Sequence, residues 1–230
     1  MRARLLLVMI LSATMVGIAA RAEEPAWTAL FDGASLDGWV QRGGAAKYRA
    51  ENGEVVGTSV PKTSNSFLCT AKDYRDFILE LEFKVDPKLN SGIQIRSQCF
   101  DEAKTVDAGG KPHKIPAGRV HGYQVEIDPS ERAWTAGIYD EGRRGWLNDL
   151  KDNEPARKAF KQNDWNAVRV ECRGDSIKTW LNGVPAADLH DALTPQGFIA
   201  LQVHGVGDST EPREVRWRKI RIQELAPAVP

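Results

Sequence analysis

The sequence predicts an all-β fold in which antiparallel strands form a two-sheet sandwich or jelly roll. Three observations predict it: apolar residues recur with a period of two, glycine-containing turns separate short segments, and helical periodicity is almost absent. Turns at 173–175 and 182–183 join successive strands into hairpins, which excludes a fold built from βαβ units. Only the stretch 155–161 is expected to form a helical turn.

The clearest predicted strand covers residues 77–85, where apolar side chains at odd positions alternate with Glu80, Glu82 and Lys84. Further strands are expected at residues 55–58, 92–97, 122–127, 134–139, 168–172, 177–181, 197–204 and 215–223. Two polar segments, 100–120 and 141–163, are expected to be long loops, which in compact domains are usually functional or mobile.

The N-terminus has the pattern of a cleaved signal peptide over residues 1–22. Arg2 and Arg4 precede an apolar run at 5–19 that is short for a membrane span, and Ala-Arg-Ala at 20–22 fits a signal peptidase site. We therefore expect a periplasmic or secreted protein that folds as one β-sandwich domain over residues 23–230. A retained N-terminal anchor is the alternative.

The balance of acidic and basic residues argues against some classes of binding partner. The chain has 31 basic and 31 acidic residues, and removal of the signal segment leaves 28 basic residues against 31 acidic ones. No basic block occurs, which argues against nucleic acid and anionic membrane and suits an uncharged carbohydrate. No cofactor is expected. The four histidines lack HxH or HExxH spacing, and Asp32, Asp37 and Asp128 match no cation-binding loop, so metal binding stays an open question.

Three cysteines, Cys69, Cys99 and Cys172, allow at most one disulfide in an oxidising compartment. Cys172 alternates with apolar residues of a strand and is interpreted as a buried hydrophobic side chain. The Cys69–Cys99 pair is the disulfide to test.

A polar sheet face is the main functional prediction. In three expected strands the side chains opposite the core are Gln94 and Arg96, Gln124 and Glu126, and Gln202 and His204. Amides, a guanidinium, a carboxylate and an imidazole match the paired donors and acceptors of sugar hydroxyls. If the strands are neighbours, these residues form a carbohydrate groove. An exposed hydrogen-bonded network, including an Arg96–Glu126 ion pair, is the alternative.

Two other features bear on a sugar site. Trp146 lies in a polar segment without apolar alternation, so it is expected either to stack on a sugar or to anchor its loop. Residues 126–131 match the E-x-D-x-x-E pattern of laminarinase-like retaining glycosidases, whose two carboxylates lie about 5 to 5.5 Å apart. Pro129 within this pattern places Glu131 beyond the strand end, which argues against that interpretation.

Several ordered motifs span nearly the whole chain after the signal segment. They are Leu30-Phe31-Asp32-Gly33, Leu36-Asp37-Gly38-Trp39, Asn90-Ser91-Gly92-Ile93-Gln94-Ile95-Arg96, Gly122-Tyr123-Gln124-Val125-Glu126-Ile127, Gly137-Ile138-Tyr139-Asp140, Trp165-Asn166, Trp180-Leu181-Asn182-Gly183 and 197–205. Together they resemble the 3-keto-disaccharide hydrolase domain family. The resemblance implies a concanavalin A-like jelly roll, usually exported, that acts on glycosides oxidised at C3. Where many members resemble Tyr-Glu-x-Gln, residues 123–126 read Tyr-Gln-Val-Glu, which exchanges acid and amide on the same face.

This resemblance implies a mechanism for the polar face. The carbonyl of a 3-keto sugar acidifies the C2 proton, so a base removes it, the C1 substituent leaves, and water adds to the enone. Glu126 or His204 is expected to be the base, and the other to protonate the leaving oxygen. The remaining expected roles are enolate stabilisation by Arg96 with Gln94 or Gln124, donation by Tyr139, ring positioning by Gln202 and stacking by Trp146. A non-catalytic sugar-binding module and a retaining glycosidase are the alternatives.

Overall fold

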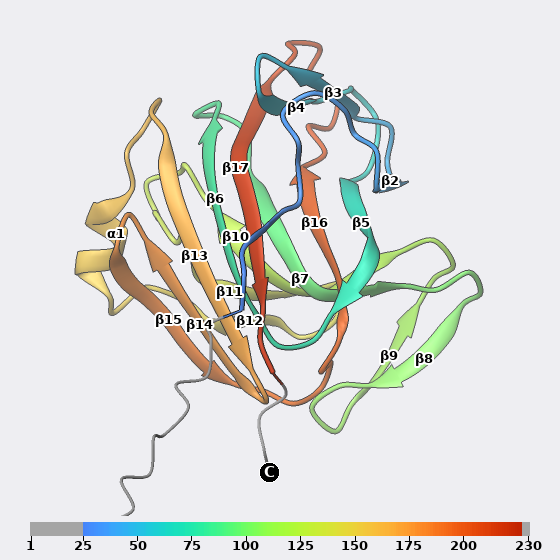
Figure 1. The fold of residues 1–230 in the computed structure, drawn as a ribbon. Coiled ribbons are helices and arrows are strands. Elements are labelled where there is room, and N and C mark those ends of the chain that lie inside the picture. The colour runs from blue at the N-terminus through green and yellow to red at the C-terminus, as the bar shows by residue number, and fades with distance from the viewer. Residues whose placement is uncertain (1–24, 227–230) are drawn as a thin grey trace, which may run out of the picture.

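The computed structural model describes residues 25–226, so the predicted signal peptide lies outside the described residues. Within them the chain forms two stacked β-sheets, a small hairpin and one helical turn (Figure 1). Every strand pairing among these residues is antiparallel. The predicted all-β jelly-roll sandwich is therefore confirmed. No helix within residues 25–226 has the length and apolar character needed to cross a membrane.

One sheet, called the back sheet here, faces the viewer in Figure 1. Its strands lie in the order β15 (Val184–His190), β14 (Ser176–Leu181), β13 (Asn166–Arg173), β6 (Phe77–Val85), β17 (Glu214–Glu224), β4 (Glu54–Thr58) and β3 (Lys47–Glu51), and β1 (Thr28–Ala29) also pairs with β17. Consecutive strands β13, β14 and β15 are the hairpins predicted from the turns at 173–175 and 182–183.

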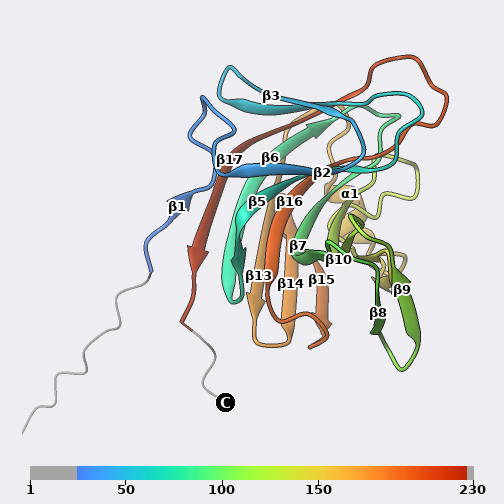
Figure 2. The same ribbon diagram turned by 90° about the vertical axis from the view of Figure 1, so that its right-hand side faces the viewer.

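The second sheet, called the site sheet, lies behind it. Its order is β12 (Gly145–Asn148), β11 (Ile138–Glu141), β10 (Val120–Ile127), β7 (Ser91–Cys99), β16 (Gly197–Val203), β5 (Ser66–Tyr74) and β2 (Trp39–Gly43). Figure 2 shows the two sheets edge-on, with the hairpin of β8 (Lys104–Asp107) and β9 (Pro112–Ile115) projecting beside β10. The helix α1 (Glu154–Ala159) occupies the predicted helical position.

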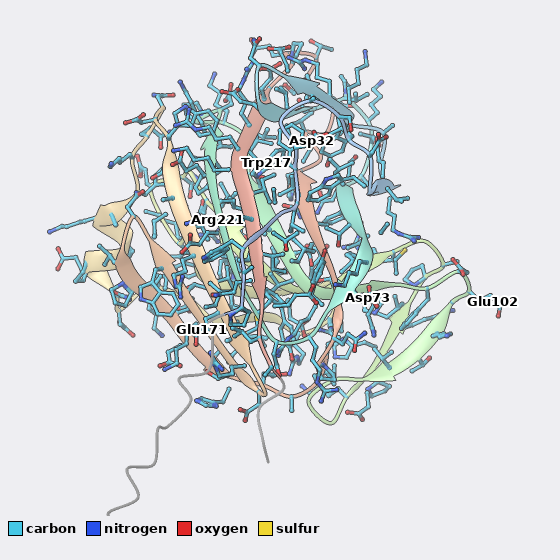
Figure 3. The ribbon with its side chains drawn as sticks, in the orientation of Figure 1. Asp32, Asp73, Glu102, Glu171, Trp217 and Arg221 are labelled. Carbon is cyan, nitrogen blue, oxygen red and sulfur yellow. The ribbon has the colours of Figure 1, made fainter. Side chains whose placement is uncertain are left out.

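The core lies between the sheets and follows the period of two. In β6 the odd positions are buried and the charged side chains point to the outer face. Tyr123, Val125 and Ile127 of β10 contribute to the same apolar cluster, and Trp217 of β17 is fully buried in it (Figure 3). Burial of about 25 cal/mol per Å² of apolar area makes this cluster the main stabilising contribution. Because one face of each sheet is committed to the core, register is fixed and the opposite face is free for polar chemistry.

Some predicted boundaries were wrong. The strand expected at 134–139 begins only at Ile138, because Ala136 has a φ of 72° and the amide of Gly137 donates to the Trp134 carbonyl in a turn. The two expected loops also contain structure: β8 and β9 lie in the first, and β12 and α1 lie in the second.

The proposed Cys69–Cys99 disulfide is not formed, and all three cysteines are free. Cys69 lies on β5 and Cys99 on β7, and β16 separates these two strands. Strands two positions apart lie roughly 9–10 Å from each other, beyond the ~7 Å limit between the Cα atoms of a disulfide. Burial raises the pKa of the Cys69 and Cys172 thiols to about 12, so both remain protonated and unreactive at neutral pH.

The expectation that Arg96 lies on the polar face was also wrong. Arg96 has a φ of 46°, and the pairing of β7 with β10 shifts by one residue at this point. This β-bulge reverses the alternation, so the guanidinium turns away from Gln94. It is fully buried, ion-paired with Asp76 at 2.9 Å, and donates to the carbonyls of Arg75 and Gly174 at 2.6 and 2.7 Å.

We expect Arg96→Met to destabilise the fold strongly. The substitution leaves the Asp76 carboxylate buried without its guanidinium, and loss of one partner of a buried ion pair costs about 3–5 kcal/mol. Urea denaturation measures this change in the free energy of unfolding. Arg173→Met is the control, because the Arg173 side chain is 50% exposed and its pair with Glu171 is worth at most about 1 kcal/mol. Equal midpoints for the two variants would contradict the structural role of Arg96.

Candidate functional site

A polar pocket of about 390 Å³ opens on the face of the site sheet that points away from the core. Its lining residues come from strands, strand ends and turns: Asn65, Asn90, Gln124, Glu126, Arg132, Tyr139, Glu141, Trp146 and His204. We call it the site pocket. Segments far apart in the sequence meet here because β10, β7, β16 and β5 are adjacent in the sheet.

Three glutamines form the floor of the site pocket. Gln94 and Gln124 are direct partners in the pairing of β7 with β10, and Gln202 lies on β16, on the other side of β7. The Gln124 Oε1 atom accepts hydrogen bonds from Gln94 Nε2 at 2.6 Å and from Gln202 Nε2 at 2.8 Å. The Ser97 hydroxyl donates to Gln94 Oε1 at 2.6 Å. These three amides, called the amide row, occupy one face as the alternation predicts.

Glu126 is the acceptor at the end of the amide row. Its Oε2 accepts from Gln124 Nε2 at 2.7 Å, and its Oε1 accepts from Asn90 Nδ2 at 2.6 Å. A carboxylate can only accept, so Gln124 must turn its NH₂ group toward Glu126 and its oxygen toward the other two glutamines. The charge of one carboxylate therefore orients every amide in the row.

Burial raises the pKa of Glu126, and the negative charge of Asp128 adds to this effect. The hydrogen bonds from Asn90 and Gln124 and the charge of Arg132 act in the opposite direction, because they favour the carboxylate. A partly desolvated carboxylate with a raised pKa and a second lone pair on each oxygen is a suitable proton acceptor.

His204 lies at the end of β16, on the other side of the amide row from Glu126. Its Nδ1 lies 2.8 Å from the Gly205 carbonyl, which can only accept, so Nδ1 carries the proton and Nε2 is the free nitrogen of the neutral ring. Glu141 also lines the site pocket, is buried and forms an ion pair with Arg119. Burial raises the pKa of Glu141, and the charges of Arg119 and His204 partly offset that rise.

An aromatic wall closes one side of the site pocket. Trp146 packs edge-on against Tyr139 and Trp134, with ring centroids 5.3 and 4.9 Å away. The guanidinium of Arg132 lies over both indoles, 4.6 Å from the Trp134 ring and 5.1 Å from the Trp146 ring. Burial and the charges of Glu141 and Glu126 raise the pKa of Tyr139, so its hydroxyl keeps its proton and can donate.

The structure brings most of the predicted site residues together. Glu126, His204, Gln124, Tyr139 and Trp146 line the pocket, and Gln94 and Gln202 lie directly beneath, fully buried; Arg96 is absent for the reason given above. Sequence reasoning missed Asn65, Asn90, Arg132 and Glu141 as site residues. Asn90 is the first residue of the motif at 90–96 and could have been predicted from it. The positions of Asn65, Arg132 and Glu141 depend on strand order and turn geometry, which the sequence pattern does not give.

The residues of the E-x-D-x-x-E pattern do not converge. Asp128 accepts hydrogen bonds from Ser130 and from the amide of Trp134, and it forms an ion pair with Arg132 at 2.8 Å. Glu131 is exposed and lines a different hollow beside α1. The carboxylate pair of a retaining glycosidase is therefore not built from this motif.

A larger hollow of about 800 Å³ lies on the back sheet. Its charged side chains are already paired: Glu80 with Arg169 at 2.7 Å and with Arg221 at 2.6 Å, and Glu82 with Lys219 at 2.7 Å. Such exposed pairs neutralise each other and leave little for a polar ligand. Within residues 25–226, no cluster of three or more His, Cys, Asp or Glu side chains is arranged to hold a metal ion.

Comparison with models of known protein families identifies the family of this chain. A model described as a 3-keto-alpha-glucoside-1,2-lyase-like domain matches residues 26–223. The chain belongs to this family. A comparison with curated proteins finds no match.

Several solved structures share the fold of this chain. A candidate glycosyl hydrolase from Parabacteroides distasonis ATCC 8503 is similar at 16% identity and a TM-score of 0.55, over 87% of this chain and 94% of that one. The carbohydrate-binding module CBM66 from Bacillus subtilis has 15% identity and a TM-score of 0.56, over 86% and 100%. A protein of unknown function with a galectin-like fold from Bacillus subtilis has 11% identity and a TM-score of 0.61, over 90% and 99%. At these identities the likeness establishes the fold alone.

The Gln124 side chain lies across β7 at Gly92, and the close approach leaves no room for a side chain at position 92. A Cβ atom at position 92 would lie 2.5 Å from Gln124 Cδ and 2.6 Å from Cγ, far inside contact distance. We expect Gly92→Ala to lower the free energy of unfolding by about 1–3 kcal/mol through overpacking. Thermal and urea denaturation measure it.

The matched control is a double-mutant cycle with Gln124→Ala. If the clash with Gln124 is the cause, Gly92→Ala should have little effect in the Gln124→Ala background. Additive effects of the two substitutions would show that the close approach is not what requires glycine at this position.

Proposed function

We propose that this protein cleaves the glycosidic bond of 3-keto-glycosides by removing the C2 proton and eliminating the C1 substituent. The observation that carries the proposal is the buried Glu126 carboxylate, held by Asn90 and Gln124 in a pocket that also contains His204. This arrangement supplies a base and an acid at one polar cavity of sugar size, and membership of the 3-keto-alpha-glucoside-1,2-lyase-like family supports the choice of substrate.

In the proposed reaction Glu126 is the base. The C3 carbonyl acidifies the C2–H bond, Glu126 accepts the proton, and the electron pair is delocalised onto the C3 oxygen as an enolate. The enolate then forms the C1=C2 double bond as the C1–O bond breaks. The leaving oxygen takes a proton from the protonated form of His204, which lines the same pocket. Each proton transfer contributes on the order of 10² to 10⁴ in rate.

Water then adds to the enone, with oxygen bonding to C1 and a proton returning to C2. The net reaction consumes one water molecule and yields the 3-keto sugar and the free aglycone. Tyr139 is suited to donate a hydrogen bond to a sugar hydroxyl, and Trp146 offers its ring to a sugar face. Gln94 and Gln202 support the carboxylate through Gln124 rather than touching the sugar, because both are fully buried.

His204 as base and Glu126 as acid is the reverse assignment. The neutral Nε2 of His204 makes that assignment chemically reasonable. We prefer Glu126 as base because its two amide donors, Asn90 and Gln124, favour the charged form that a base requires. We further propose that residues 1–22 direct the protein to the periplasm or the exterior, where such sugars would be encountered.

The first test compares a 3-keto-glucoside with its unoxidised parent. We expect release of the aglycone from the keto form only, together with exchange of the C2 proton for solvent deuterium, measured by NMR. Release from the parent would favour a glycosidase, and binding without release or exchange would favour a sugar-binding module.

We expect Glu126→Gln to reduce turnover of the 3-keto-glucoside about 10²- to 10⁴-fold and to abolish C2 exchange, because the amide cannot accept the proton. His204→Ala should reduce aglycone release more than C2 exchange if the imidazole acts on the leaving oxygen. Steady-state kinetics and NMR exchange on the same samples separate the two steps. A Glu126→Gln enzyme with the wild-type rate would remove Glu126 from the mechanism.

The pH dependence gives an independent test of Glu126. As the base it must be deprotonated, so kcat/KM should fall as the pH drops through its raised pKa. The hydrogen bond from Asn90 favours the charged form, so Asn90→Ala raises this pKa further and should move the acidic limb of the profile to higher pH. Asn148→Ala is the control, because the Asn148 amide donates to the Asp188 carbonyl and not to Glu126. In this variant the acidic limb should stay at the wild-type pH. An acidic limb unmoved by Asn90→Ala would argue against Glu126 as the titrating group.

A further inference from the structure

Proton removal next to a ketone places negative charge on the ketone oxygen, and a site that stabilises this oxygen needs a preorganised donor or cation. Arg96, the guanidinium expected for this task, is buried against Asp76 and has no access to the site pocket. Arg119 uses a terminal nitrogen to pair with Glu141 and does not line the pocket. Arg132 is the guanidinium among the pocket-lining residues within 25–226.

Arg132 is fixed in place by charge and by stacking. Its Nε donates to Asp128 Oδ2 at 2.8 Å, and its guanidinium carbon lies 4.6 Å from the Trp134 ring centroid and 5.1 Å from that of Trp146. Asp128 is itself held by the Ser130 hydroxyl at 2.6 Å and by the amide of Trp134. Cation–π stacking and a carboxylate contact together restrict a side chain that would otherwise be mobile on a turn.

The fixed contact uses only Nε of Arg132. Over residues 25–226 the side-chain hydrogen bonds of Arg132 go to Asp128 alone, so Nη1 and Nη2 remain available for a ligand. A guanidinium with a blocked Nε and two open terminal nitrogens can still present a pair of N–H donors to one oxygen or to two neighbouring oxygens. The side chain is 43% exposed, which gives a substrate access to it.

Arg132 also lies on the appropriate side of the site pocket. Glu126 is at the end of β10 and Arg132 is in the turn that follows, whereas His204 is on β16, across the amide row. Both side chains line the site pocket. On a 3-keto sugar the C2 proton and the C3 oxygen are borne by adjacent carbons, so the base and the oxyanion donor must also be adjacent.

Resting on the function proposed above, we infer that Arg132 is a catalytic residue that binds the C3 oxygen and stabilises the enolate, with Asp128 and Trp146 as its positioning residues. The sugar then lies with C2 and C3 toward Glu126 and Arg132, and with C1 and its leaving group toward His204. In this orientation the aromatic wall contacts the part of the sugar ring that bears the C3 carbonyl, and it does not contact the aglycone.

The test uses Arg132→Met and Arg132→Lys, with Arg173→Met on the back sheet as the matched control. For Arg132→Met we expect kcat for a 3-keto-glucoside and the C2 exchange rate to fall together by about 10²- to 10³-fold, as for loss of one oxyanion donor. Arg132→Lys should recover part of this loss, because it keeps the charge but not the stacking geometry. Arg173→Met should retain the wild-type rates. Circular dichroism and melting temperature verify that each variant is folded.

A second readout separates catalysis from simple binding. The unoxidised parent glucoside has a hydroxyl at C3 and develops no enolate, so its dissociation constant should change less than threefold in Arg132→Met. Asp128→Asn should reproduce a fraction of the kcat loss by releasing the guanidinium. Equal loss of parent binding and of kcat/KM, with kcat unchanged, would overturn the catalytic role.

The outcomes also distinguish this inference from the function on which it rests. If the wild-type protein neither exchanges the C2 proton nor releases the aglycone, the proposed function fails and the role of Arg132 fails with it. If the wild-type protein does both and Arg132→Met matches it, only the role of Arg132 is wrong.

Discussion

The hydrogen bond from Gln124 to Glu126 is the interaction on which the site depends. It joins a buried amide to a carboxylate, and the acceptor-only character of that carboxylate sets the direction of every hydrogen bond back through Gln94 to Ser97. Burial makes an unsatisfied amide costly, so the row has one favoured arrangement while Glu126 is charged. The jelly roll places β10, β7 and β16 side by side, which keeps the three amides within hydrogen-bonding distance of one another.

The period of two explains why part of the site is visible in the sequence. Gln94, Gln124 and Gln202 each lie between apolar residues in a strand, and any antiparallel sheet with one buried face directs such residues to the other face. Strand order is not contained in this local pattern. It arises from pairings between distant segments, and it is what brings Asn65 and His204 to the same cavity as Glu126.

Arg96 shows the limit of the alternation rule most directly. One residue with a positive φ introduces a bulge, and every side chain beyond it changes face relative to the ideal strand. A non-glycine residue in that conformation gives no signal in the sequence, because the contacts that accompany it, such as the buried pair with Asp76, join separate segments of the chain. Arg132 was missed for a related reason: turns have no period, so the direction of a turn side chain follows from contacts such as those with Asp128 and Trp134.

The residues of the pocket lie on two kinds of element, which differ in how well they tolerate insertions and substitutions. Glu126 and the amide row stand on paired strands whose other face forms the core, so insertions there would shift register and disrupt the whole sandwich. Arg132 stands instead on the connection after β10, and Trp146 stands on the edge strand β12, which pairs on one side only with β11. Connections and sheet edges tolerate changes of length and composition better than central strands. In descendants of this fold, the proton-transfer machinery is therefore expected to persist while the shape of the entrance diversifies, so that one catalytic floor could serve sugars with many different appendages.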